Sequence, residues 1–581
     1  MIQEKLKGVP CHTEDFAPFP PASQRVYWES LLEASRQRIL DTSKKTAIKG
    51  YPFLSAPLYM EFSKSGDRGH FEGKYFEKRR KLNAAVLAEC ITHDQSHLND
   101  IIEGIYSICE ETGWQLPAHN SYIRDTPQEI LPDPNRPVLD LFACETGSLL
   151  TTVRSLLKPE LDKVSPLIIQ RIEEIVTERI IEPYLTTHFW WMGDGDEPMC
   201  NWTPWCTQNV LIAIFSLSTS EATRQKAIVQ AAYSLDCFLK DYGDDGCCNE
   251  GAQYYRHAAL CLFGSLEILN IVTKNAFIQV YQEKKIRNMA TYIMNVHAQG
   301  PYFINFSDCS VLAGLCGSRE YLFAKRIGDE DFKNFALCQY QQDAFENRDL
   351  PQEINLTYRL LALFLEREMT TLQPNPPSGK DIYYPSTGLL VSRDNTYVLA
   401  VKAGGNGDSH NHNDTGSLTI YKDGNPFLID VGVESYTKKT FSPQRYEIWT
   451  MQSFFHNVTN FSSYMQEAGE QFRASDTTVL LKGNPSIRME LKDAYPKQTK
   501  VRSYIREVTH RKNEGITLTD TVQTASLPTM TLMCVEKPSI QGDTISLGKL
   551  GTIQIQPCPD LHAITIEEIP ITDERLRLAW P

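Results

Sequence analysis

The 581-residue sequence predicts a multidomain α + β protein, with a helical N-terminal part and a strand-rich C-terminal part. Its length is too great for one ordinary hydrophobic core. Apolar residues recur at helical spacing up to about residue 370, and beyond residues 373–379 (QPNPPSG) they alternate in short runs. The proline- and glycine-rich composition of that stretch indicates a linker. We therefore expect one domain over residues 1–375 and another over residues 376–581.

Three segments of the N-terminal part carry clear helix signals. Ser165 and Pro166 are typical of an N-cap followed by proline in the first turn, and apolar residues then line one face. A second helix is expected over about 220–240, and a third after the glycine-containing loop at 243–251. Successive helices with little strand signal predict an array of helical hairpins, closed as an incomplete barrel or α/α toroid.

The C-terminal part contains short alternating segments separated by turns. The expected strands are TYVLAVKAG, SLTIYKDG, PFLIDVG, GITLTDTV and TISLG. The turn at 422–425 (KDGN) joins two of them as a hairpin. Many short strands at regular spacing predict an antiparallel β-sandwich.

Composition narrows the choice of partners and compartment. The net charge of −14 argues against nucleic acid as the main partner, although it leaves room for an anionic sugar in a locally basic cleft. No apolar run is long enough to cross a membrane. The N-terminal residues lack the apolar stretch of a secretory signal, and fifteen cysteines at irregular spacing indicate free thiols. We therefore expect a cytoplasmic protein; its oligomeric state is left open.

The densest polar cluster is the sequence HNHND at 410–414, directly before an expected strand. Asp430 ends the strand PFLID, and His456 follows in SFFHN. Two imidazoles and a carboxylate on neighbouring strands suit a three-ligand zinc site with one open position. The alternative is a hydrogen-bonded polar turn without metal.

Two further clusters lie in the helical part. The segment 245–257 (DGCCNEGAQYYRH) brings Tyr254 and Tyr255 to the start of a helix, where a tyrosine can transfer protons if nearby cations lower its pKa. The segment 188–206 contains four tryptophans around Asn201 and suits either a sugar-stacking wall or core packing. Taken alone, aromatic packing at a helix start explains the tyrosine segment better than a catalytic role does.

Together the clusters resemble the heparinase II/III-like polysaccharide lyases, which combine an α/α toroid with an antiparallel β-sandwich. The resemblance is most specific at HNHNDTGSLTIYKDGNPFLIDVG and SFFHN, and moderate at DGCCNEGAQYY and at the Asn201-Trp202 pair. It implies that His410, Tyr254 and Asn201 are catalytic, with the adjacent Tyr255 as the alternative to Tyr254. It also implies a zinc ion of structural role, bound by three residues: His412, Asp430 and His456.

Substrate contacts are expected from Trp202, Glu250, Tyr255 and Arg445. We also expect Tyr254 and His410 to approach each other in one site. Several family members have histidine where this sequence has Trp202, which casts doubt on any mechanism that needs a histidine there. Tyr254 then remains as base and acid, with His410 as the alternative base.

The implied reaction is β-elimination on a 4-linked uronic acid within an anionic oligosaccharide. The uronate carboxylate must be neutralised, a base removes the C5 proton, and an acid protonates the leaving O4. Three alternatives remain: a zinc hydrolase, a carbohydrate-binding protein without activity, and a glycoside hydrolase. The last needs a carboxylate pair, for which Asp245 and Glu250 are the nearest candidates.

Overall fold

A computed structural model describes the chain except for residues 13–15, 125, 409, 557–562 and 581. The chain forms two compact units. Unit 1 comprises Met1–Tyr242, Arg256–Ala290 and Leu315–Pro377, and unit 2 comprises Gly243–Tyr255, Thr291–Gly314 and Ser378–Pro581. The expected division at residue 375 treats each domain as one continuous stretch. The structure instead groups 243–255 and 291–314 with the strands, because polar side chains of these two segments form hydrogen bonds with other residues of unit 2.

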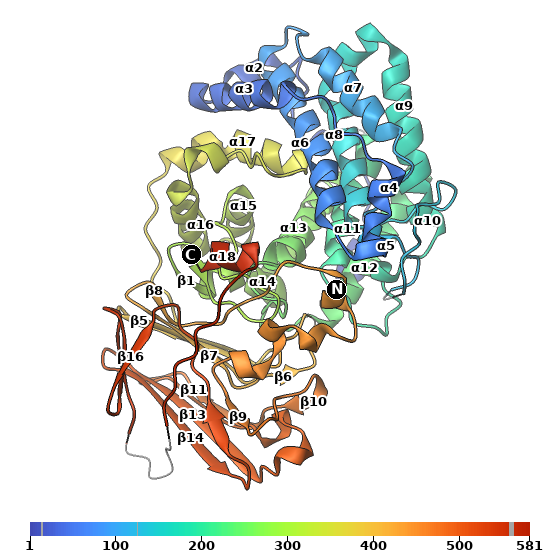
Figure 1. Cartoon of the computed structure of the whole chain (residues 1–581). Helices are drawn as coiled ribbons and strands as arrows, with labels where there is room; N and C mark the ends of the chain where they lie inside the picture. The colour runs from blue at the N-terminus through green and yellow to red at the C-terminus, as the bar shows by residue number, and fades with distance from the viewer. Residues whose placement is uncertain (13–15, 125, 409, 557–562, 581) are drawn as a thin grey trace. The chain divides into compact units, whose positions relative to one another are not determined.

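Unit 1 is an incomplete α/α toroid, in which helices that follow one another in sequence pack as hairpins (Figure 1). Its helices are α1 (Ile2–Leu6), α2 (Arg25–Glu29), α3 (Glu33–Ala47), α4 (Ala56–Tyr59), α5 (Glu61–Ser65), α6 (Gly69–Thr92), α7 (Leu98–Cys109), α8 (Leu141–Val164), α9 (Pro166–Val176), α10 (Glu182–Thr186), α11 (Trp202–Ser216), α12 (Glu221–Asp241), α13 (Tyr255–Val272), α14 (Lys284–Asn295), α15 (Ser318–Ile327), α16 (Glu330–Gln342) and α17 (Leu356–Thr371).

Local sequence explains where two of these helices begin. The Ser165 hydroxyl accepts a hydrogen bond from the Leu167 amide at the start of α9, and Ser220 does the same for the Thr223 amide at the start of α12. Both helices and the Ser165 cap were expected from the sequence, whereas the Ser220 cap was not singled out. The buried faces of α8, α9 and α11 join one apolar core, so the helices are held mainly by packing.

Unit 2 is an antiparallel β-sandwich followed by a short C-terminal helix. Its two larger sheets have the strand orders β3-β4-β5-β7-β8 and β11-β12-β13-β14. The strands are β1 (His297–Gln299), β2 (Tyr302–Phe303), β3 (Ile382–Tyr384), β4 (Leu389–Arg393), β5 (Tyr397–Lys402), β6 (Gly405–Asn406), β7 (Leu418–Lys422), β8 (Asn425–Leu428), β9 (Thr459–Phe461), β10 (Gly469–Arg473), β11 (Ser475–Leu480), β12 (Ser486–Glu490), β13 (Ser503–Arg511), β14 (Gly515–Gln523), β15 (Pro528–Met530), β16 (Pro538–Gln541), β17 (Thr544–Leu547) and β18 (Gly551–Gln554), and the helix is α18 (Glu574–Ala579).

The sandwich core follows from strand alternation. Leu399 and Val401 of β5 pack in one cluster with Ile487 of β12 and Val508 of β13, so the two larger sheets share their apolar faces. The expected hairpin joins β7 to β8. Asp423 and Gly424 in its turn have φ of 48° and 78°, the left-handed conformation that two-residue hairpin turns require.

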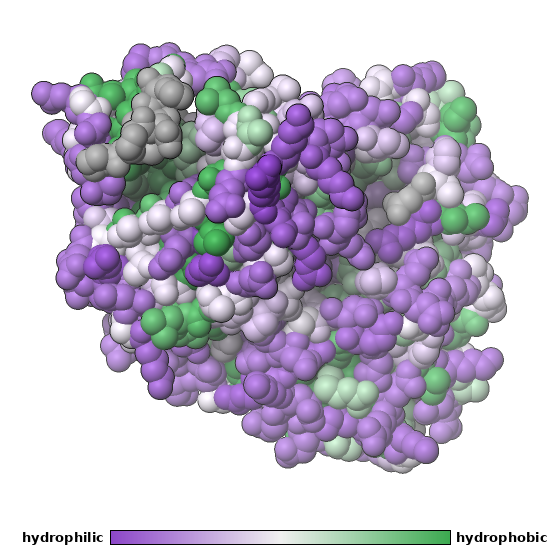
Figure 2. Space-filling model, turned by 90° about the horizontal axis from the view of Figure 1, so that it is seen from below, coloured by the Kyte–Doolittle hydropathy of each residue, from purple (hydrophilic) through white to green (hydrophobic). Residues whose placement is uncertain are grey.

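The visible surface in Figure 2 is mostly hydrophilic, with hydrophobic residues only in small scattered patches. Isolated apolar residues of this kind are usual on a protein surface. Among the described residues, no helix is both long enough and apolar enough to span a bilayer.

Candidate active site

Two loops that precede the sandwich in sequence form one wall of the site in unit 2. Gly251 has φ of 88°, and a Cβ placed there would lie 2.6 Å from the Cys309 Cβ, so the loops approach as closely as glycine allows. The Gln253 amide donates to the Cys309 sulfur over 3.3 Å, and the Gln253 side-chain oxygen accepts from the Ser310 amide over 3.1 Å. These contacts fix Tyr254 beside the loop that carries Asp308.

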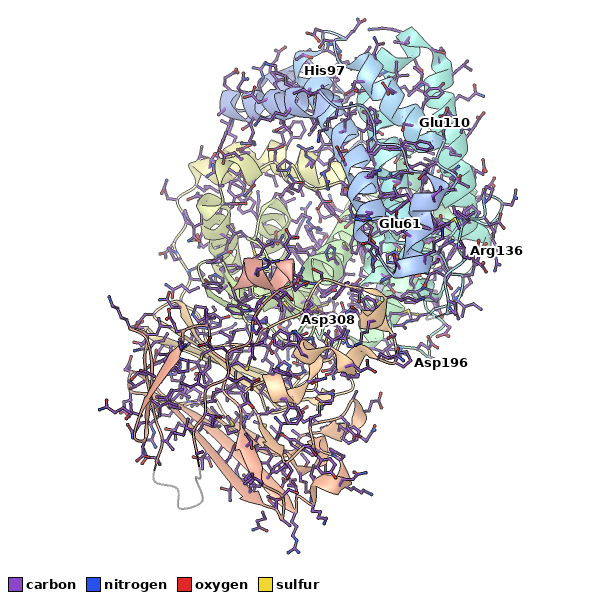
Figure 3. The ribbon with its side chains drawn as sticks, in the orientation of Figure 1. Glu61, His97, Glu110, Arg136, Asp196 and Asp308 are labelled. Atoms are coloured by element: carbon purple, nitrogen blue, oxygen red, sulfur yellow. The ribbon has the colours of Figure 1, made fainter. Side chains whose placement is uncertain are left out.

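Asp308 is the electrostatic centre of the site (Figure 3). Its Oδ2 accepts a hydrogen bond from His410 Nδ1 over 2.8 Å. Its Oδ1 accepts from His412 Nε2 over 3.0 Å and from the Arg445 guanidinium over 2.7 Å. Burial alone would raise the pKa of Asp308, but the hydrogen bonds from His410 and His412 outweigh burial and hold it well below its usual value. Asp308 is therefore a carboxylate that orients three cationic or polar side chains.

His410 is held in one orientation by its neighbours. Its backbone has φ of 56°, and its carbonyl accepts from the Asp308 amide over 3.2 Å. Its Nε2 lies 3.9 Å from a carboxylate oxygen of Glu250. Burial lowers the pKa of His410, whereas the hydrogen bond to Asp308 and the charge of Glu250 raise it, and the net result is a pKa above the usual value. The site therefore favours the imidazolium form of His410.

Tyr254 packs against His410, as the sequence predicted, and their ring centroids lie 4.9 Å apart. The Tyr254 hydroxyl is 2.5 Å from the hydroxyl of Tyr436, a residue that sequence reasoning did not single out. Burial raises the pKa of Tyr254, while the hydrogen bond with Tyr436 and the charge of Arg575 act in the opposite direction. The two phenols and the imidazole thus form one compact group.

Three residues that were expected to contact substrate are buried in the structure or hydrogen-bonded to other residues. Tyr255 is completely buried and packs 6.3 Å from the ring of Tyr292, so its hydroxyl does not face a ligand. Glu250 is only 3 % exposed. The Arg445 guanidinium is occupied by Asp308 and by the carbonyls of Thr440 and Asn411. In this structure Glu250 and Arg445 orient His410 and Asp308.

Buried donors suitable for a metal ion lie next to His412. Ligand atoms of Asp414, Asp430 and His456 all fall within 4.8 Å of one another, and His456 Nδ1 is 3.2 Å from a carboxylate oxygen of Asp430. The ring of His412 is 5.5 Å from that of His456. Within the described part of the chain, Nδ1 of His412 has no hydrogen-bond partner although it is buried. Burial lowers the pKa of His412 and so favours the neutral imidazole that binds metals.

The predicted set of His412, Asp430 and His456 fits in its chemistry the zinc ion that the family resemblance implies, although the ligand atoms that lie within 4.8 Å of one another are those of Asp414, Asp430 and His456. Two imidazoles and one carboxylate are usual zinc ligands, and a buried nitrogen without a partner is explained by a ligand at that point. Asp414 is a second acidic residue at this point, which the sequence analysis did not assign. Its Oδ1 accepts from the buried Lys402 ammonium over 2.8 Å, so Lys402 already balances its charge.

Asn201 and Trp202 belong to unit 1, where Asn201 precedes α11 as its N-cap. Trp202 packs against His119, with ring centroids 4.8 Å apart, and against Trp190 at 5.1 Å. The guanidinium of Arg124 lies 4.6 Å above the Trp190 ring. This partly exposed group of aromatic and basic side chains is the kind of surface that sugars stack on.

The other two tryptophans of the segment 188–206 are structural. Trp191 is completely buried, and its indole donates to the Leu139 carbonyl over 2.8 Å. The Trp205 indole donates to Glu145 Oε1 over 2.7 Å and stacks on His257 at 4.0 Å. Burial raises the pKa of Glu145 to about 8. Core packing therefore accounts for Trp191 and Trp205, whereas sugar stacking on Trp190 and Trp202 stays a prediction.

The two candidate carboxylates for a glycoside hydrolase, Asp245 and Glu250, are both engaged by other residues of the protein. Asp245 accepts hydrogen bonds from the Cys247 amide and from the Ser386 amide and hydroxyl, so both of its oxygens are engaged. Glu250 faces His410 from a buried position. Asp245 therefore stabilises the loop and does not present a free carboxyl group.

Comparison with known proteins finds a family match in the C-terminal part of the chain. Residues 376–556 match the family model of the heparinase II/III-like C-terminal domain. Among curated proteins, none matches the sequence significantly.

Solved structures share the fold over most of the chain. A mutant heparan sulfate lyase from Pedobacter heparinus aligns with a TM-score of 0.53 and 15 % identity, covering 94 % of this chain and 77 % of that one. A heparinase III gene product aligns with a TM-score of 0.54 and 16 % identity, covering 89 % and 75 %. Another heparinase III structure aligns with a TM-score of 0.53 and 12 % identity, covering 94 % and 79 %. The C-terminal part of the chain therefore matches the heparinase II/III-like C-terminal domain, and the chain shares its fold with these structures.

Proposed function

We propose that this protein is a polysaccharide lyase that cleaves 4-linked uronic-acid oligosaccharides by β-elimination. The observation that carries the proposal is the grouping of two phenols with an imidazolium. Tyr254 and Tyr436 share a 2.5 Å hydrogen bond beside His410, whose Nδ1 is held by Asp308. Proton-transfer groups and a cation are the two components that elimination next to a carboxylate requires.

His410 would act mainly through its charge. An imidazolium held by Asp308 and Glu250 is suited to neutralise a uronate carboxylate, and it is a poor base in that form. Neutralisation makes the C5 proton more acidic and stabilises the enolate-like intermediate. The family resemblance also implies a role for Asn201, a residue of unit 1, as a neutral hydrogen-bond donor to a uronate carboxylate.

Tyr254 would transfer the protons. As a phenolate it takes the C5 proton, the C4–C5 double bond forms, and the bond from C4 to O4 breaks. The resulting phenol then returns a proton to the departing O4. Because burial raises the pKa of Tyr254, the phenolate is scarce at neutral pH, and turnover should rise with pH over the alkaline range.

His412, Asp430 and His456 would hold zinc as a structural ion. When bound, zinc would supply positive charge that fixes its ligands; the chain's own His412 would then present Nε2 to Asp308, as it does in the structure. The described cysteines are all free, which supports the proposal of a reducing, cytoplasmic location.

The test is Tyr254→Phe, with Tyr255→Phe as its matched control. The first variant should lower turnover by roughly 10²–10⁴-fold, the range for losing a general acid or base, with little change in substrate binding. The second should retain turnover, because the Tyr255 hydroxyl is buried. Product is followed by the ultraviolet absorbance of the unsaturated uronate and by mass. A product that has gained water, or full activity of Tyr254→Phe, would refute the proposal.

A further inference from the structure

The C-terminal helix α18 reaches the candidate site from a part of the chain beyond the matched family domain. That domain ends at residue 556, whereas α18 spans Glu574–Ala579. The Asp573 carboxylate accepts from the Ser435 amide over 3.1 Å, and the Trp580 indole donates to the Val431 carbonyl over 2.9 Å. Both ends of the helix are therefore fastened to the segment that leads into Tyr436.

Between these two anchors, Arg575 points into the site. Its guanidinium donates to the Gln253 side-chain oxygen over 2.9 Å and to the Asp308 carbonyl over 3.3 Å. It also lies 5.3 Å from the centre of the Tyr436 ring. One side chain thus touches the residue before Tyr254, the backbone of Asp308 and the partner of the Tyr254 hydroxyl.

The charge of Arg575 has no direct counter-ion. Among the described residues, no carboxylate lies within ion-pair distance of its guanidinium. The groups around it are neutral: a carboxamide, a backbone carbonyl and a phenol ring. A half-buried cation surrounded by neutral dipoles is available to stabilise a negative charge that appears nearby.

We propose that α18 completes the active site and that Arg575 is a positioning residue that favours the phenolate of the Tyr254–Tyr436 pair. The inference rests on the proposed function, because it concerns the proton transfer assigned to Tyr254. Arg575 does this in two ways: its charge attracts the phenolate, and its bond to Gln253 fixes the backbone next to Tyr254. The charge of Arg575 opposes the rise in pKa that burial causes at Tyr254 and also at Tyr436.

The first test is the pH profile of kcat for Arg575→Gln. An opposite charge within about 4–6 Å shifts a pKa by about one unit or more, and the Arg575 guanidinium lies 5.3 Å from the centre of the Tyr436 ring, so the alkaline limb should move upward by about one pH unit. At a fixed pH below that limb, kcat should fall roughly tenfold. The KM should change little, Arg575→Lys should restore part of kcat, and added guanidinium should partly rescue Arg575→Ala.

Arg577→Gln is the matched control on the same helix. Arg577 is exposed, and among the described residues its guanidinium donates only to the Thr572 carbonyl, at 2.8 Å. This variant should keep the wild-type melting temperature, kcat and pH profile. An unshifted kcat profile in folded Arg575→Gln would overturn the inference, whatever happens to KM.

A second measurement does not depend on turnover. Difluorotyrosine is introduced at position 254 of the full-length protein, and its pKa is read by fluorine NMR titration with and without Arg575→Gln. The pKa should rise by about one unit in the variant. Elimination activity without this rise refutes the role of Arg575 alone. The rise without any unsaturated product refutes the proposed function while the coupling of Arg575 to Tyr254 stands.

Discussion

Asp308→Asn keeps the shape of a completely buried side chain but removes the charge that three donors share. The carboxamide of asparagine has a single oxygen, so it can accept hydrogen bonds at only one of the two positions where the Asp308 oxygens accept them. If that oxygen faces His412 and Arg445, the new NH₂ group faces Nδ1 of His410, where two donors then oppose each other. The other orientation sacrifices two hydrogen bonds and is less favourable.

The expected cost follows from this geometry. One charge-assisted hydrogen bond is lost, which is worth roughly 1.5–3 kcal/mol, and two others become bonds to a neutral acceptor, which are about half as strong. The buried Arg445 also loses its counter-ion. Breaking one partner of a buried ion pair costs about 3–5 kcal/mol, and we expect Asp308→Asn to fall in that range.

Hydrogen exchange with mass spectrometry measures this cost locally, because amides of unit 2 report the free energy of opening. Asp520→Asn is the control. It breaks a comparable pair with Arg506, at 2.7 Å, within the sandwich. Both variants should weaken protection, but only Asp308→Asn should abolish turnover below the melting temperature. A loss of protection equivalent to less than about 1 kcal/mol for Asp308→Asn would refute the electrostatic account of the site.

Other changes give distinct outcomes. The pKa of Glu145 is about 8 in the folded protein, above its usual value of 4.5, so wild-type stability falls as the pH rises between these two values. Glu145→Gln should therefore stabilise the protein by about 3 kcal/mol at pH 7 and by little near pH 4.5. Melting temperatures of the two proteins that change in parallel with pH would contradict this. His456→Ala should reduce bound zinc from about one ion per chain towards none, measured by elemental analysis, and full occupancy would exclude the assigned site. Gly251→Ala should cost about 1–3 kcal/mol, seen as a lower denaturation midpoint, because a Cβ would meet Cys309 at positive φ; an unchanged midpoint would show that the loops need not approach so closely.

Residues with local signals were predictable from the sequence. Ser165 predicts the start of a helix because an N-cap acts within its own first turn, and the Asp423-Gly424 turn predicts a hairpin for the same reason. The histidine-rich turn at 410–414 was identifiable because its polar residues stand together before a strand. These features need only neighbours in sequence.

The rest of the site depends on contacts between distant residues. Asp308 lies 102 residues before His410 and 137 before Arg445, in a loop without any periodic pattern. Tyr436 lies 182 residues from Tyr254. The sequence could not decide between Tyr254 and Tyr255 either, because the direction of adjacent side chains at a helix start depends on what packs around them.

The origin of the loop wall has a consequence for biosynthesis. Residues 243–255 and 291–314 leave the ribosome well before the strands that they join. At about 5–20 residues per second, the 102 residues between Asp308 and His410 take roughly 5–20 s to synthesise. During that time the Asp308 carboxylate has none of the hydrogen-bond donors that it contacts in the folded protein. The N-terminal helices can pack together in the meantime, but the segments 243–255 and 291–314 cannot reach their folded contacts. A fragment that stops at residue 375 would therefore expose an unsatisfied loop, and we expect it to be a substrate for chaperones and proteases rather than a stable domain.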